Sequence, residues 1–330
     1  MTDAGERSER HVWVLLVMCA TLCVVMVGRL FFGSATFGWP SATIFEVRLT
    51  RLYIGCIVGV ALSCSGVGLQ ALLRNPLAEP FILGLSTGAG VGVMAQKLLE
   101  RHLEGPIGPS YLGALIGAGA SLMVVYVVSR RRGLIDPIWL LLTGVVISTI
   151  NGAIIMFLNF VPGSAGLRED VAAWMMGFIS DDRDQVTIWL VGAVTAVGFV
   201  TMLIRSRAMD VATFSDAEAE SLGVHLGRLR ATLLLTASML AAGAVVLAGP
   251  IAFVGLICPH VARMLLGPGH GPLVIGAALC GAMLVTLADA ASMALHLSFN
   301  WGLMPLGIFT AILGGIFFLW MLRPRGGALE

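Results

Sequence analysis

Apolar runs of about twenty residues are the feature that most limits what this chain can fold into. The first, VWVLLVMCATLCVVMVGRLFF from Val12, carries a single charge, Arg29, near its end. A helix that crosses about 30 Å of hydrocarbon needs about 20 mainly apolar residues. A signal peptide is the alternative for this run, but the run is too long and no convincing cleavage site follows it. We therefore predict a membrane-spanning helix here.

Further stretches meet the same length criterion. They fall at roughly residues 50–72, 81–98, 111–129, 138–160, 186–204, 231–248, 250–267, 273–297 and 303–322. The composition agrees, because 58% of the residues are hydrophobic and 12% are charged, whereas soluble domains have about 45–50% and about 25%. The sequence predicts an all-α membrane protein with about ten transmembrane helices in a single domain, residues 1–330. The span at 250–267 is the least regular, since Pro259 interrupts it.

The arginines indicate how these spans are oriented. An even number of spans puts both termini on one side, and a cytoplasmic placement puts most of the 20 basic residues in inner loops. Cytoplasmic loops of membrane proteins carry such an excess of Lys and Arg. We therefore expect a cytoplasmic N-terminal tail (1–11), a cytoplasmic connection at 205–230 and a cytoplasmic C-terminal tail (323–330).

Two polar connections contain helical signals. In residues 205–230, Ser215 precedes Glu218 by three positions, the spacing of a capping box, and Gly223 is suited to ending the helix. We predict a short, solvent-exposed helix there; a loop with one helical turn is the alternative. On the outer side, REDVAAWMMGF within residues 161–185 predicts a short helix at the membrane surface.

Polar and small residues inside the spans indicate a compact helical assembly. Asp289 is the only acid well inside a predicted span, and a lone acid favours a structural bridge between helices over ion transport. The 41 glycines allow transmembrane helices to pack closely. His260 and His296 are interpreted as satisfied polar groups, because no further ligand lies at metal-binding spacing. The six cysteines are interpreted as small buried apolar residues.

Motifs for several other classes of function are missing from the sequence. The single lysine, Lys97, lies in AQKLLE, so the chain has no GxxxxGK[ST] phosphate-binding loop. An HExxH motif is also lacking, and a net charge of +1 gives no preference for nucleic acid. We expect no enzyme, metal site or cofactor in this chain. If ATP drives transport, a separate subunit must hydrolyse it.

Ordered motifs in this chain resemble one family of membrane proteins. Residues 48–93, RLTRLYIGCIVGVALSCSGVGLQALLRNPLAEPFILGLSTGAGVGV, are similar to the signature segment of the permeases that import iron–siderophore, haem and cobalamin in bacteria. AESLGVHLGRLR and AGPIAFVGLICPHVARMLLG follow in the family's order, and LADAASMALHLSFNWGLMPLGIFTAILGGIFFLWML is similar to its C-terminal end. These permeases are the membrane subunits of type II, binding-protein-dependent ABC importers. The resemblance covers roughly residues 46–322.

The resemblance implies partners and roles. The expected partners are a second permease subunit (a homodimer), two cytoplasmic subunits that bind ATP and Mg²⁺, and a periplasmic substrate-binding protein, all at the bacterial inner membrane. Residues 205–230 would transmit the movement of the ATPase, and we name them the coupling segment; the contact residues implied are Ser215, Glu218, Ala219, Leu222, Gly223 and Val224. Arg48 and Arg51 match arginines that dock the binding protein in related importers. The motif residues expected near the cytoplasmic side are Gln70, Arg74, Asn75, Pro76, Pro80, Pro259, His260 and Arg263.

The chain departs from the family pattern at three positions. Family members often have an arginine at the position of Met293, a glutamate at Leu303 and a proline at Ile316; the missing arginine removes part of the outer basic rim. The alternative function is a secondary transporter or channel without an ATPase, which predicts buried ion-binding acids or discontinuous midplane helices that bear charge. The sequence leaves open the cargo (siderophore, haem or cobalamin) and the choice between a homodimer and a heterodimer.

Overall fold

The helices of the structure follow the predicted spans in order. The computed structural model describes residues 2–33, 37–109, 111–131, 134–161, 174–180, 184–299 and 302–321. Its long helices are α1 (Thr2–Phe31), α2 (Ala42–Leu73), α3 (Leu85–His102), α4 (Leu112–Ser129), α5 (Pro137–Leu158), α7 (Gln185–Val211), α9 (Leu226–Ala248), α10 (Val254–Leu266), α11 (His270–Phe299) and α12 (Leu306–Met321). Each predicted span overlaps one of them, although the span at 81–98 begins before α3 in a short 3₁₀ turn. The all-α membrane fold is therefore confirmed.

Not all of these helices meet the criteria for crossing a membrane by themselves. Seven are long and apolar enough, whereas α10 and α12 are apolar but shorter. Helix α3 has the length, but Lys97, Glu100 and Arg101 make its last turns polar. Among the described residues, the remaining elements are a 3₁₀ turn η1 (Pro80–Leu83), the short helix α8 (Asp216–Ser221) and an antiparallel ribbon of β1 (Arg130–Arg131) and β2 (Leu134–Ile135).

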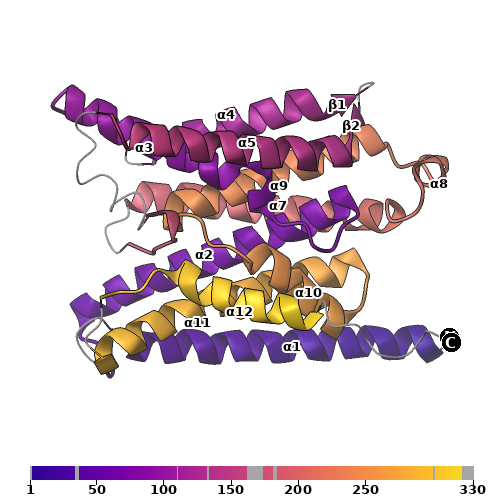
Figure 1. The fold of residues 1–330 in the computed structure, drawn as a ribbon. Coiled ribbons are helices and arrows are strands. Elements are labelled where there is room, and N and C mark those ends of the chain that lie inside the picture. Colours follow the sequence, from indigo (N-terminus) through magenta and orange to yellow (C-terminus); the bar gives the residue numbers. More distant parts are fainter. Residues whose placement is uncertain are drawn as a thin grey trace.

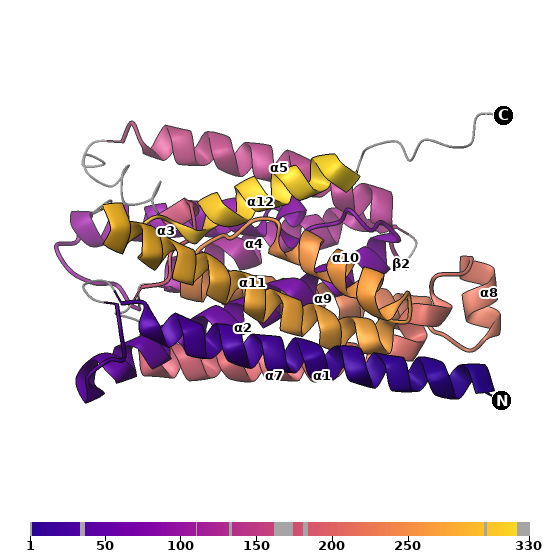
Figure 2. The same cartoon turned by 90° about the horizontal axis from the view of Figure 1, so that it is seen from below.

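Both ends of the described chain lie on one side of the bundle. The start of α1, the end of α12 and the whole of α8 occupy the same end of the molecule (Figures 1 and 2). This arrangement agrees with an even number of crossings. It also places α8 at the end of the bundle assigned to the cytoplasm, level with the start of α1 (Figures 1 and 2).

Helix α2 is the central element of the bundle. Helices α1, α10, α11 and α12 lie on one side of it, and α3, α4, α5, α7 and α9 lie on the other (Figure 1). Side chains along its length, among them Ile54, Val58 and Leu69, are completely buried. The helix therefore has neighbours on all sides, as expected for a helix that is apolar all round.

Glycines permit the closest of these contacts. A Cβ added to Gly59 of α2 would lie 2.2 Å from the carbonyl oxygen of Gly281 in α11, and one added to Gly66 would lie 1.9 Å from that of Gly255 in α10. Both distances are shorter than a van der Waals contact. Small residues at these crossings let the backbones touch, which is how helices associate in lipid.

Replacing Gly59 with valine should destabilise the bundle. The new side chain must push α2 and α11 apart, and overpacking of this kind costs about 1–3 kcal/mol. Thermal unfolding of the detergent-purified protein measures the effect. Gly28→Val is the control, because a Cβ at Gly28 meets nothing within 4 Å; equal melting temperatures for the two variants would contradict the packing argument.

Some expectations need correction or fall outside the described residues. The expected N-terminal tail (1–11) is helical from Thr2 onward and continues into the first span as α1, while its cytoplasmic placement stays a prediction. Two of the six cysteines, Cys19 and Cys23, are exposed on α1, so the prediction that all six are buried was wrong. Most of the predicted surface helix within 161–185, and the C-terminal tail 323–330, lie outside the described residues.

Candidate functional site

The predicted short helix in the coupling segment exists and is fixed at both ends. Ser215 Oγ accepts a hydrogen bond from the Glu218 backbone N at 3.3 Å, and Glu218 Oε2 accepts one from the Ser215 backbone N at 3.0 Å, which completes the capping box. At the other end, Val224 N donates to the Ala219 carbonyl at 3.1 Å, and Gly223 has φ +84°. This is the hydrogen-bond pattern of a glycine-terminated helix.

The bounds of this helix are narrower than the coupling segment. Helix α7 continues to Val211 and α9 begins at Leu226, so only residues 212–225 lie outside the two long helices. The predicted cap positions are nevertheless correct. The alternative, a loop with a single helical turn, is wrong, because Asp216–Ser221 forms a capped six-residue helix.

Two arginines from distant parts of the chain hold α8 by one carboxylate. Asp216 Oδ1 lies 2.6 Å from Arg74 Nη2, and Asp216 also accepts two bonds from Arg230 Nη2, at 3.0 and 2.9 Å. Arg74 Nε further donates to the Ala212 carbonyl at 2.8 Å. The end of α2, the start of α9 and α8 are therefore joined at one point.

The charge of Asp216 is set by these partners. Partial burial acts to raise the pKa of Asp216, but the charges and hydrogen bonds of Arg230 and Arg74 outweigh it and hold the pKa below its usual value. The side chain of Asp216 is 48% exposed, so the ion pairs are worth at most about 1 kcal/mol each. They position α8 more than they stabilise the whole fold.

Replacing Asp216 with asparagine should loosen α8 without unfolding the protein. Hydrogen–deuterium exchange in residues 212–224 should rise, with Glu220→Gln as the control.

Because the folded pKa of Asp216 lies below its unfolded value, its stabilising effect is present above the usual aspartate range and is lost as pH falls through the lowered pKa. Wild-type protection should therefore stay constant between about pH 5 and pH 8; a change in that range would contradict this account.

Helix α8 presents two apolar side chains to its surroundings. Phe214, just before the N-cap, is 55% exposed, and Leu222, at the C-terminal end, is 63% exposed. Ala219 between them is completely buried against the bundle. A Cβ added to Gly223 would meet nothing within 4 Å. A rigid helix that displays exposed apolar side chains has the anatomy of a contact surface.

The NPLAEP turn that follows α2 leaves the cytoplasmic side after a few residues. Arg74 ends α2 in the left-handed conformation (φ 47°), and Asn75 Oδ1 accepts a hydrogen bond from Leu77 N at 2.9 Å. Pro80 lies beside the middle of α2, because a Cβ on Gly255 would approach both Pro80 and the Leu62 carbonyl. The predicted cytoplasmic turn is therefore only the first part of this segment, and its Pro76 is exposed. The rest of the segment, with Pro80, re-enters the bundle.

Gln70 compensates for a hydrogen bond that Pro259 removes. A proline inside a helix has no N–H for the carbonyl four residues earlier, which here belongs to Gly255. Gln70 Nε2 donates to the Gly255 carbonyl at 3.3 Å. This bond explains how α10 can contain Pro259 within the bundle, and it links two of the predicted motif residues.

Helix α10 begins inside the bundle rather than at its surface. Phe253 caps it in the left-handed conformation (φ 68°), and its backbone N donates to the Glu79 carboxylate. The η1–α3 break beside it is likewise internal, since a Cβ on Gly84 would meet Ile147 in the middle of α5. Such discontinuous helices were expected of the alternative, a secondary transporter. Here the carboxylate completes a helix terminus, so the breaks do not by themselves favour that alternative.

The other two motif residues of α10 lie further along it. His260 packs edge-on against Phe317 of α12, with ring centroids 5.6 Å apart. Arg263 lies in the last turn and is half-buried. Both are in the half of α10 nearer the cytoplasmic side, as expected.

Asp289 lies in a buried cluster with two arginines. Its Oδ2 accepts from Arg29 Nε at 2.5 Å and its Oδ1 from Arg51 Nε at 2.8 Å. All three side chains are at most 3% exposed. The arginine–aspartate cluster joins α1, α2 and α11 and agrees with the predicted structural bridge.

The two arginines predicted to dock a binding protein are buried. Arg51 belongs to the arginine–aspartate cluster and lies over the Phe178 ring at 5.4 Å. Arg48 donates through Nη1 to the carbonyls of Leu30, at 2.5 Å, and Gly38, at 2.8 Å. The expectation that Arg48 and Arg51 are exposed basic side chains therefore needs correction. Both arginines hold the outer ends of α1 and α2 together, and direct docking through them stays a prediction.

The positions that depart from the family pattern lie in different surroundings. Met293 is buried one turn beyond Asp289 on α11, Leu303 is half-buried before α12, and Ile316 is exposed on α12. At position 293, where family members often have an arginine, this chain therefore has a buried apolar side chain.

Several interacting residues were missed by the sequence argument. Arg29, Glu79, Asp216 and Arg230 all have partners far away in the chain. His270 is also among them, because its backbone N and its Nδ1 contact Asp210 Oδ1 at 2.9 and 2.6 Å and tie α11 to α7. Glu79 and Arg230 carried a signal, since they lie in the NPLAEP and AESLGVHLGRLR motifs.

Comparison with known proteins agrees with this arrangement. The model of the FecCD transport family matches residues 11–324. The cobalamin import system permease protein BtuC of Halobacterium salinarum is 36% identical over 294 residues, covering 88% of this chain and 76% of that protein. The hemin transport system permease protein HmuU of Yersinia pestis is 34% identical, covering 85% and 83%.

A solved structure supports the same fold. A metal-chelate type ABC transporter in an inward-facing conformation matches with a TM-score of 0.83 and 25% identity, covering 95% of this chain and 99% of that chain. Permease subunits of ABC importers work with separate ATPases, so this chain is a multi-pass transport subunit and not itself an enzyme. Since the family model spans nearly the whole sequence, the chain belongs to the FecCD transport family.

Proposed function

We propose that this permease forms the membrane pathway of an ATP-driven importer for a bulky metal chelate: a corrinoid, haem or an iron–siderophore. The chemistry of the cargo is suggested by what the relatives are named for, cobalamin and hemin import, and by the metal-chelate transporter. Two copies of the chain would enclose the pathway in the bacterial inner membrane. A periplasmic binding protein would deliver the cargo on the outer side.

The observation that carries this proposal is the construction of α8. It is capped at both ends, clamped through Asp216 to Arg74 and Arg230, and displays Phe214 and Leu222 outward. A push on such a helix reaches the end of α2 and the start of α9 directly, because the carboxylate joins all three. A separate ATPase pair, which would hold ATP and Mg²⁺, could therefore bias the inward and outward states of the bundle.

Transport in reconstituted vesicles tests the proposal. The permease is reconstituted with the ATPase and binding protein encoded beside it, and uptake of cyanocobalamin, haem and ferrichrome is measured with ATP, with a non-hydrolysable analogue, and with the ATPase omitted. We expect uptake of one cargo only with hydrolysable ATP and the ATPase. Uptake by the permease alone, or uptake driven by an ion gradient, would instead support the secondary transporter.

A further inference from the structure

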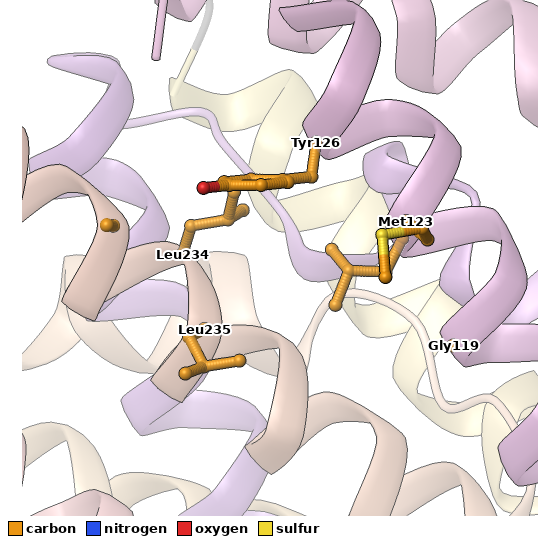
Figure 3. Close-up of a pocket in the computed structure, with 7 residues that line it drawn as sticks. Gly119, Met123, Tyr126, Leu234 and Leu235 are labelled. Carbon is orange, nitrogen blue, oxygen red and sulfur yellow. The ribbon is translucent and has the colours of Figure 1, made fainter. Parts of the chain in front are cut away.

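An apolar groove lies between α4 and α9 on the outside of the bundle. Its volume is about 350 Å³, and it is lined by Gly119, Leu122, Met123, Tyr126, Ala231, Leu234 and Leu235. Figure 3 shows Met123 and Tyr126 of α4 facing Leu234 and Leu235 of α9 across it. Among the described residues that line the groove, Tyr126 alone has a polar group on its side chain, so the groove suits a hydrocarbon ligand.

The groove lies at the depth of the cytoplasmic leaflet. Helix α4 runs inward and ends at Ser129, and Tyr126 is in its last turn. Helix α9 starts on the same side at Leu226, and Ala231 is in its second turn. At a rise of about 1.5 Å per residue, the lining residues lie within about 15 Å of the cytoplasmic helix ends.

Two arginines stand at the cytoplasmic end of the groove. Arg130 follows Tyr126 by one turn, is exposed, and lies over the Tyr126 ring at 5.7 Å. Arg228 is also exposed and precedes Ala231 by three residues and Leu235 by seven, which puts it on the same face of α9. Two acids lie nearby and both already have partners: Asp216 is paired with Arg74 and Arg230, and Asp136 accepts hydrogen bonds from the backbone N of Ile138 and Trp139 at the start of α5. The mouth of the groove is therefore basic.

We infer that this groove is a binding site for an anionic phospholipid of the cytoplasmic leaflet. One acyl chain lies along α4 and α9, and the phosphate lies between Arg130 and Arg228. The apolar lining favours a hydrocarbon chain. The two arginines at headgroup level favour a lipid with a net negative charge, which a zwitterionic lipid does not have. The inference depends on the membrane topology of the chain and not on its cargo.

Photo-crosslinking tests this site directly. The purified permease in nanodiscs is exposed to phosphatidylglycerol that carries a diazirine near the middle of one acyl chain, and mass spectrometry locates the adducts. The variant Gly119→Leu fills the groove, and its Cβ meets nothing within 4 Å, so the fold is kept. Gly28→Leu adds the same side chain at an equally open position on α1 and is the matched control. Adducts on α4 and α9 should fall at least about tenfold in Gly119→Leu and stay unchanged in Gly28→Leu.

The charge of the lipid is tested separately. Each arginine near a membrane surface contributes about fivefold to the binding of an anionic lipid. Arg130→Gln combined with Arg228→Gln should therefore lower phosphatidylglycerol labelling by about 25-fold, to the level of a matched phosphatidylcholine probe. Equal labelling by the two lipids in the wild type, adducts that persist in Gly119→Leu, or a wild-type groove that is never labelled would each overturn the inference.

Discussion

Replacement of Asp289 with asparagine is expected to destabilise the protein by about 3–5 kcal/mol. The carboxylate is the acidic partner of both Arg29 and Arg51, and all three side chains are buried. Asparagine keeps the shape but leaves two guanidinium groups facing each other without a counter-charge. The cost of breaking such a pair is large because the remaining charges cannot reach water. Thermal unfolding in detergent and the yield of inserted protein measure the loss.

A compensated variant separates the loss of charge from the loss of shape. Removal of the whole cluster, in the combination Arg29→Met, Arg51→Met and Asp289→Asn, leaves no charge at these three positions, and apolar replacement of a buried ion pair is often neutral. This triple variant should recover much of the stability lost in Asp289→Asn. If Asp289→Asn alone melts like the wild type, Asp289 does not bridge the three helices as proposed.

The second large effect is expected at α8. Replacement of Leu222 with glutamate, or of Gly223 with aspartate, should abolish ATP-dependent uptake while the permease still inserts and folds. Leu222 is largely exposed, so Leu222→Glu leaves the core undisturbed. A side chain added at Gly223 would point into open space, but the positive φ of Gly223 means that Gly223→Asp also strains the C-terminal end of α8. A new negative charge on this surface would oppose an apolar contact with the ATPase. Uptake in vesicles and co-purification of the ATPase measure the result.

The control for this surface lies at the opposite end of the molecule. Leu103 follows α3 on the outer side and is 61% exposed, so Leu103→Glu introduces the same charge at a similarly exposed site. It should leave co-purification of the ATPase unchanged. Undiminished uptake by Leu222→Glu, or loss of the ATPase from Leu103→Glu as well, would count against the coupling role of α8.

Helix α8 and the arginine–aspartate cluster differ in how much of each could be predicted from the sequence. The capping box of α8 is a local pattern in which Ser215 and Glu218 are three residues apart, so the sequence is sufficient to find it. The arginine–aspartate cluster joins residues 29, 51 and 289, and no local spacing relates them. Asn75 and Glu79 differ in the same way, because the hydrogen-bond partner of Asn75 is two residues away whereas that of Glu79 is Phe253.

The length and polarity of the apolar runs determined the order and approximate positions of the long helices, because each segment must satisfy its own backbone in lipid before it meets any neighbour. Which buried charges pair, where α10 starts within the bundle, and that Gln70 supplies the bond that Pro259 lacks were decided only by the tertiary structure. The physical reason is that desolvation acts on a single helix, whereas a buried polar group is satisfied by whichever distant atom packing brings within hydrogen-bond reach.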